Sequence, residues 1–170
     1  MDVLKEYIIP FKGLKQGEHH FVYRIDNTFL TLFDSADIEN CSLIVDVDFT
    51  NKPDFLFFRF NLKGTVTLIC DRCLDEFEYP INSSNDLYVR FADVDDEGAG
   101  DMVILPPSTG EIDLSPYVYE NIVLALPFKR VHETEEQCNR EMIEKLREHE
   151  KAGTKEIDPR WEELKKILNK

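Results

Sequence analysis

Two stretches of regularly spaced apolar residues constrain the fold of this chain more than any other feature of its sequence. Apolar side chains recur at every second position in residues 43–49 and again in residues 56–62. Because side chains alternate between the two faces of a strand, each stretch predicts a strand with one buried face. The Asn-Lys-Pro-Asp sequence at 51–54 supplies turn-forming chemistry, so the two strands are expected to form an antiparallel hairpin. Gly64 then predicts a bulge or a sharp bend.

Shorter runs with β-type composition occupy much of the rest of the first two-thirds of the chain, at residues 21–25, 66–70, 87–91 and 102–105. The acidic stretch 93–101 resembles part of a calcium-binding loop. Ile104 stands where such a loop needs a bidentate Glu, so we expect an acidic hairpin loop there.

The last third of the chain carries helix signals. Ser115 is a candidate N-cap for a helix that ends at Pro127. Residues 134–137 match a capping box, which predicts a second helix with Cys138 in its first turn. Residues 158–168 carry a short apolar stripe that predicts a third helical segment.

Together these patterns predict an α+β protein. A mainly antiparallel β-sheet, open or barrel-like, is followed by two or three C-terminal helices. We expect a single domain over residues 1–152 and a C-terminal helical tail over residues 153–170. The sequence begins without a secretory pattern and has no apolar run of the roughly 20 residues needed to cross a bilayer, so we expect a cytoplasmic protein with no membrane partner.

The charge of the chain is negative and uneven. The formal net charge is −14, and residues 1–131 account for most of it, with 23 acidic against 11 basic residues. A surface of this sign repels a phosphate backbone at long range and favours a basic partner, such as a ribosomal protein or a basic assembly factor. The alternative interpretation is that the acidity serves solubility alone.

Four residues form a candidate metal site. Cys70 and Cys73 make a CxxC at the end of a predicted strand, and His132 and Cys138 lie at the start of a predicted helix. Such a set could close a tetrahedral Cys3His site that holds structural zinc. Two other interpretations stay open: a redox CxxC, which usually lies at a helix N-terminus, or a group of reduced thiols without metal. Cys41 is expected to serve packing.

No arrangement of residues in the sequence predicts catalysis. There is no nucleophile beside a base, no Gly-rich phosphate loop and no HExxH motif, and His19 and His20 would point to opposite faces of a strand. We therefore expect a non-catalytic protein with no small-molecule substrate. If the four candidate ligands converge, Arg72, Lys129 and Arg130 converge with them and form a local basic patch for RNA or a partner.

Several segments, taken in order, resemble one known family. Leu68–Leu74, with its Cys-Asp-Arg-Cys-Leu core, is followed by Ile112–Leu114, by Glu120–Pro127, by His132 and Cys138, and by Asp158–Lys166. This order resembles the YceD-like family of large ribosomal RNA subunit accumulation proteins. The resemblance implies a role in the accumulation or processing of 23S rRNA, with the precursor rRNA as an alternative partner, and it implies no enzymatic activity.

Overall fold

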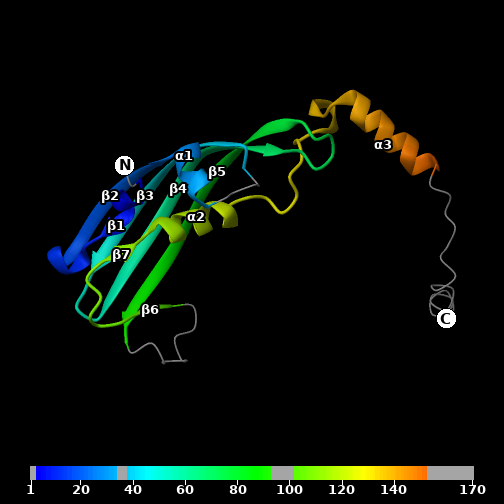
Figure 1. The fold of residues 1–170 in the computed structure, drawn as a ribbon. Helices are drawn as coiled ribbons and strands as arrows, with labels where there is room; N and C mark the ends of the chain where they lie inside the picture. The colour runs from blue at the N-terminus through cyan, green and yellow to red at the C-terminus, as the bar shows by residue number, and fades with distance from the viewer. Residues whose placement is uncertain (1–2, 34–37, 93–101, 153–170) are drawn as a thin grey trace, which may run out of the picture.

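The structure is a computed structural model and describes residues 3–33, 38–92 and 102–152. Its main feature is a five-stranded sheet in the order β2-β3-β4-β5-β6 (Figure 1). The neighbouring strands are antiparallel except for β5 and β6, which are parallel. The strands are β2 (Gly17–Ile25), β3 (Asn40–Asn51), β4 (Phe55–Ile69), β5 (Glu76–Phe91) and β6 (Val103–Leu105).

Smaller elements surround this sheet. Strand β1 (Ile8–Ile9) pairs with β7 (Ile112–Asp113) in a separate two-stranded sheet. The α-helices are α1 (Asn27–Leu30), α2 (Ser115–Leu124) and α3 (Arg140–Ala152), and the 3-10 helices are η1 (Val3–Tyr7), η2 (Phe11–Gly13), η3 (Thr31–Phe33) and η4 (Glu135–Gln137). The α+β prediction is confirmed. In the described part of the chain the main sheet is open, with β2 and β6 as its edges, and it does not close into a barrel.

Two predictions fall on residues that the structure does not describe. These are the acidic hairpin loop at 93–101 and the tail at 153–170, including its helical segment at 158–168. The single-domain boundary at residue 152 stays a prediction.

The predicted hairpin is confirmed as β3 and β4. Phe49 pairs with Phe58 across the hairpin, and their rings stack with centroids 4.5 Å apart. The apolar positions that recur at every second residue are the buried ones, as an alternating pattern requires. Gly64 does not interrupt the strand: β4 runs through it, and Gly64 pairs with Leu43 and Ile81 on either side.

Helix α2 covers the buried face of the sheet (Figure 1). Val118 and Ile122 point into the core and are fully buried. The helix begins differently from the prediction, because Leu114 is its N-cap and Ser115 its first residue. The carboxylate of Asp113 accepts hydrogen bonds from the backbone N–H and the hydroxyl of Ser115, at 2.8 and 2.7 Å, and so supplies the polar partner expected of a cap.

The N-terminal segment completes the core, although its sequence pattern did not predict that it is buried. Tyr7 is almost wholly buried and stacks on Tyr23 of β2 with centroids 4.8 Å apart. Its backbone carbonyl accepts from the N–H of Leu114, which ties the N-terminal segment to the start of α2. A two-residue strand that pairs with residues far along the chain leaves no local periodicity to read.

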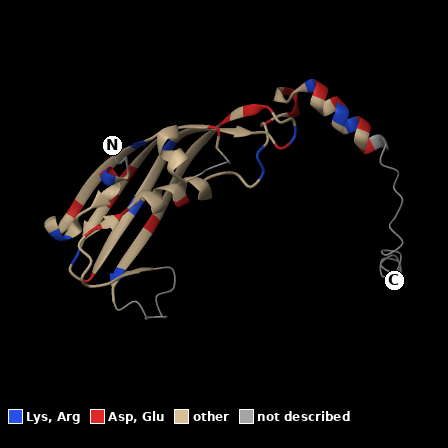
Figure 2. Ribbon diagram, viewed as in Figure 1, with Lys and Arg blue, Asp and Glu red and all other residues tan. Residues whose placement is uncertain are grey.

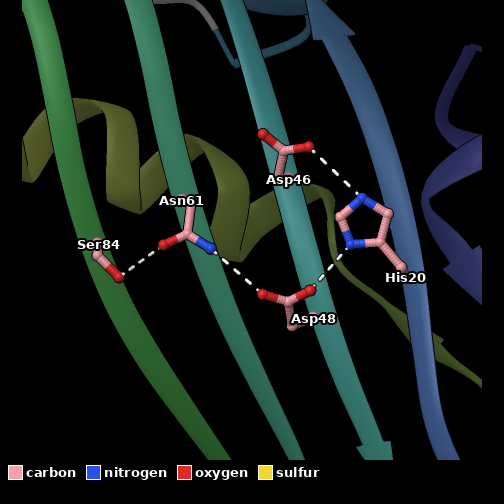
Figure 3. Close-up of polar contacts among 5 residues, drawn as sticks. All are labelled: His20, Asp46, Asp48, Asn61 and Ser84. Carbon is pink, nitrogen blue, oxygen red and sulfur yellow. Dashed lines mark hydrogen bonds and ion pairs between the residues drawn. The ribbon is translucent and has the colours of Figure 1, made fainter.

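The opposite face of the sheet carries a polar network that crosses four strands (Figure 3). His20 contacts Asp48 at 2.9 Å and Asp46 at 3.5 Å. Asp48 accepts from the Asn61 amide, and Asn61 accepts from the Ser84 hydroxyl at 2.9 Å. Helix α2 lies behind the strands in this view, so this face is the one that the helix leaves open.

One ion pair on this open face gives a pH-dependent prediction. Arg59 donates two hydrogen bonds to Asp86, at 2.8 and 3.0 Å, and this contact lowers the pKa of Asp86. A carboxyl with a lowered pKa stabilises the fold above its ordinary pKa near 4, and that contribution is lost as the pH falls through its lowered value. We therefore expect Asp86→Asn to cause a small loss of stability at pH 7 that shrinks on acidification.

Urea unfolding of the wild type and of Asp86→Asn between pH 7 and pH 3 measures this difference. Asp54→Asn is the matched control, since it removes a charge from the β3–β4 turn instead. An Asp86→Asn deficit that stays constant across this pH range would contradict the assignment.

Candidate metal centre

The structure brings together the four residues that the sequence singled out. One ligand atom from each of Cys70, Cys73, His132 and Cys138 lies within 4.8 Å of every other. The Nδ1 atom of His132 lies 3.6 Å from the sulfur of Cys73 and 3.6 Å from that of Cys138. A strand-end thiol pair and a His/Cys pair from far along the chain therefore converge on one point.

The first half of the cluster is the turn that joins β4 to β5. The N–H of Cys70 donates to the carbonyl of Asp75 at 2.9 Å, and the N–H of Leu74 donates back to the carbonyl of Cys70 at 2.9 Å. Leu74 has a φ of 65°, which is unusual for a residue with a side chain and marks a tight turn. This turn aims both sulfurs into the same space.

A second contact fixes the segment that carries His132. The N–H of Asp71 donates to the carbonyl of Arg130 at 2.7 Å, and the N–H of Arg130 donates to the Asp71 carboxylate at 2.9 Å. This pair of bonds holds the chain that leaves α2 against the CxxC turn. The sequence gave no sign of this role for Asp71, because the partners are 59 residues apart.

The second half of the cluster differs in detail from the prediction. The capping box of Thr134 and Gln137 is present, but it opens only the three-residue helix η4. Cys138 ends that turn instead of lying in the first turn of a long helix. Helix α3 starts at Arg140, and the Asn139 side chain caps it by accepting from the N–H groups of Glu141 and Met142. Asn139 is an N-cap residue type, which is the signal that could have located this start.

The three thiols of the cluster are shielded from solvent, and His132 is half-buried. The apolar shell around the sulfurs is a small second core made of Ile143, Phe77, Val131 and Met142, and Phe77 also packs on the core of the sheet. The Phe77 ring packs on the His132 ring with centroids 5.1 Å apart. A metal held here would have four protein ligands and no open position, which is the pattern of a structural site.

Two thiols of the cluster, those of Cys70 and Cys138, differ in how readily they ionise. Burial alone would raise the pKa of Cys70. Hydrogen bonds from the backbone of His132, Arg72 and Cys73 outweigh it, and the pKa of Cys70 falls to about 6. Burial raises the pKa of Cys138 to about 11, and the neighbouring thiols of Cys73 and Cys70 add to this. One sulfur is thus readily ionised, and a cation between the sulfurs would favour the thiolate form of all three.

The surroundings of the CxxC do not match a redox motif. A redox CxxC gains its reactivity from the N-terminus of a helix. Here the motif lies in the turn between two strands, and the residues after it form β5. Cys41 is buried apart from the cluster, and its thiol points to the carbonyl of Ile25 at 3.8 Å, in agreement with a packing role.

The three basic residues of the predicted patch come from both halves of the cluster. The guanidinium of Arg72 points inward, with Nη1 3.8 Å from the sulfur of Cys138. Arg130 is bound through its backbone to Asp71, and the exposed Lys129 precedes it. The backbones of these three residues lie beside the Cys3His cluster, and the Arg72 side chain contacts the sulfur of Cys138.

The fold and the cluster define a class of protein: an open, mostly antiparallel sheet whose longest hairpin ends in a buried Cys3His cluster that anchors a C-terminal helix. The sequence profile of the YceD family, described as "Large ribosomal RNA subunit accumulation protein YceD", matches residues 58–168. The chain belongs to this family. The matched region contains all four residues of the cluster.

One relative is similar to this chain over part of its length. The uncharacterized protein YlbN of Bacillus subtilis (strain 168) is 30% identical over 116 residues, which cover 65% of this chain and 65% of the relative. No solved structure matches the chain. None of the helices among the described residues has the length and apolar character to span a membrane.

Proposed function

We propose that this protein is a non-catalytic ribosome-biogenesis factor that acts in the cytoplasm and supports the accumulation or processing of 23S rRNA. The observation that carries the proposal is the family match over residues 58–168 together with the family's description. Depletion of the protein in its host should lower mature 23S rRNA relative to 16S rRNA. Restoring it with the wild-type gene is the control, and unchanged 23S levels on depletion would overturn the proposal.

The cluster is proposed to hold structural zinc through Cys70, Cys73, His132 and Cys138. A tetrahedron with Zn–S bonds of about 2.3 Å and a Zn–N bond of about 2.1 Å has S···N edges of about 3.6 Å. The two sulfur-to-Nδ1 distances of 3.6 Å fit such edges. Zinc at this point would fasten α3 and the preceding segment to the hairpin tip.

The primary partner is proposed to be a basic ribosomal protein or assembly factor. Acidic residues are spread along the strands of the sheet and the hairpin tip (Figure 2), and residues 1–131 carry 23 acidic against 11 basic residues. Complementary charge of this kind speeds association and selects basic partners. Such an acidic surface could shield a basic protein until rRNA is available.

A pull-down with the purified chain tests this partner. We expect a basic large-subunit protein to be recovered at low salt and lost at high salt, because screening weakens attraction between exposed charges. The charge-reversed variant Asp48→Lys on the open face tests the same surface. It should recover less of the basic protein at low salt than the wild type does. If no basic ribosomal protein is recovered at low salt, the partner is not of this kind.

Direct binding of rRNA is the second candidate function, through Arg72, Lys129 and Arg130. The bonds between Asp71 and Arg130 support it, because they hold the two basic segments together. Crosslinking to rRNA should fall in the Arg72→Glu/Arg130→Glu variant. Because Arg72 contacts the Cys138 sulfur, Lys129→Glu is needed as a second variant that leaves the cluster intact. Unchanged crosslinking in both variants would exclude the patch.

A further inference from the structure

Phe128 is exposed in a way that no other phenylalanine of this protein is. All twelve phenylalanines lie in the described part of the chain, and the other eleven are buried or half-buried. Phe128 shows 106% relative exposure, so its whole ring faces solvent. A fully exposed aromatic ring keeps its face free to stack on a ligand, which gives this position a chemistry that the other phenylalanines lack.

The exposure does not come from a loosely held segment. On one side, the N–H of Ala125 donates to the carbonyls of Asn121 and Ile122, and the N–H of Leu126 donates to that of Val123 at 3.2 Å. On the other side, Arg130 is bound to Asp71 at both its N–H and its carbonyl. Only three residues lie between these anchors, and one of them is Pro127, which fixes its own φ. The ring is therefore presented by a short, pinned segment.

The charges beside the ring are positive. No acidic residue occurs from Asn121 to His132, whereas Lys129 and Arg130 directly follow Phe128. Figure 2 shows a short basic stretch on the segment that runs from α2 toward the hairpin tip. The carboxylate of Asp71, which lies against this segment, already accepts a hydrogen bond from the N–H of Arg130. At a screening length of about 8 Å, the local charge rather than the net charge of −14 governs short contacts.

A flat aromatic face beside cations is the chemistry with which proteins hold unpaired nucleotides. Bases stack on exposed aromatic rings, and Lys or Arg contact the adjacent phosphates. We infer that Phe128 stacks on an unpaired base of RNA while Lys129 and Arg130, which directly follow it, contact phosphates beside that base. This inference rests on the second candidate function proposed above. It adds to that function a residue, Phe128, that would distinguish single-stranded from paired RNA.

The test is RNA binding by the full, metal-loaded chain. Affinity for a short, labelled single-stranded RNA is measured for the wild type and for Phe128→Ala, Phe128→Leu and Phe128→Trp. The Ala and Leu variants should bind roughly 10-fold more weakly, since stacking of one base contributes about 1–3 kcal/mol, and the Trp variant should bind like the wild type. In a Trp161→Phe background, RNA should quench the fluorescence of Trp introduced by Phe128→Trp. The same RNA as a duplex should bind more weakly than the single strand.

Leu124→Ala is the matched control, because Leu124 is an exposed apolar residue (77%) at the end of α2. It should leave RNA binding unchanged. If Phe128→Leu binds like the wild type, or if Leu124→Ala and Phe128→Ala weaken binding equally, the segment docks through apolarity, as into a groove of a protein, and stacking is overturned. Absence of RNA binding by the wild type also overturns it. The 23S rRNA level and the pull-down are independent measurements. Failure of the RNA-binding test would therefore not contradict the role in ribosome biogenesis or the basic protein partner.

Discussion

Replacing Cys73 by Ser is expected to abolish metal binding and to release α3 from the hairpin tip while the main sheet stays folded. A hydroxyl is a poor substitute for a thiolate ligand, so bound zinc should fall from about one equivalent per chain to nearly none. Besides the bonds between Asp71 and Arg130, the module around the cluster has only a small core, which contains Ile143 with Val131, Met142 and Phe77 packed on it. The sheet has its own, far larger core and should survive.

Two measurements report this outcome. Metal analysis of protein purified without chelator or affinity tag gives the zinc content. Limited proteolysis then reports the release of α3, because each loss of about 1.4 kcal/mol in local stability raises the open, cleavable fraction about tenfold. Cleavage between residues 131 and 152 should accelerate, and the sheet should resist. Treatment of the wild type with a strong chelator should reproduce the same pattern.

Cys41→Ser is the matched control for this variant. Cys41 is as buried as the cluster thiols but lies in the core of the sheet, where its sulfur points to a backbone carbonyl. This variant should keep the full zinc content and the protection of α3, whatever it loses in core packing. Full zinc content in Cys73→Ser would refute the Cys3His assignment.

The local patterns of this sequence predict its structure well where an element is formed by residues that are close together in the sequence. The hairpin of β3 and β4 follows from alternation within each strand and a turn between them. The convergence of the four cluster residues was also predicted, because the CxxC turn and the His132/Cys138 pair each have a recognisable spacing, although the sequence distance between the two pairs gave no proof of contact.

The parts that escaped prediction depend on contacts between distant segments. The pairing of β1 with β7, the burial of Tyr7 and the bonds between Asp71 and Arg130 link residues far apart in the chain. The displaced start of α3 has a local cause, because the capping box and Asn139 compete as helix starts and the box opens only a 3-10 turn. The exposure of Phe128 could not be predicted from the sequence, because a phenylalanine that follows an apolar run is normally expected to be buried.

Gly64→Ala is the second variant with a large expected effect, and it should destabilise the protein by about 3 kcal/mol or more. A Cβ at this position would lie 2.1 Å from the carbonyl oxygen of Ser42 and 2.9 Å from the Cα of Leu43. Both are backbone atoms of β3, so relief requires the two strands to separate where Leu43 pairs with Gly64. The φ of Gly64 is +144°, a conformation that residues with a side chain rarely adopt.

Urea unfolding measures this effect, with Gly13→Ala as the matched control. A Cβ added at Gly13 would meet no other atom within 4 Å, and the φ of Gly13 is not positive. This variant should therefore change stability by less than about 1 kcal/mol. The comparison separates a steric conflict in the sheet from the general effect of glycine on the unfolded chain, which both substitutions share. Because β4 continues from Gly64 to the CxxC turn, separation of β3 from β4 would also loosen the strand that carries Cys70. Equal effects of the two substitutions would mean that the strands do not approach as closely at Gly64 as the structure shows.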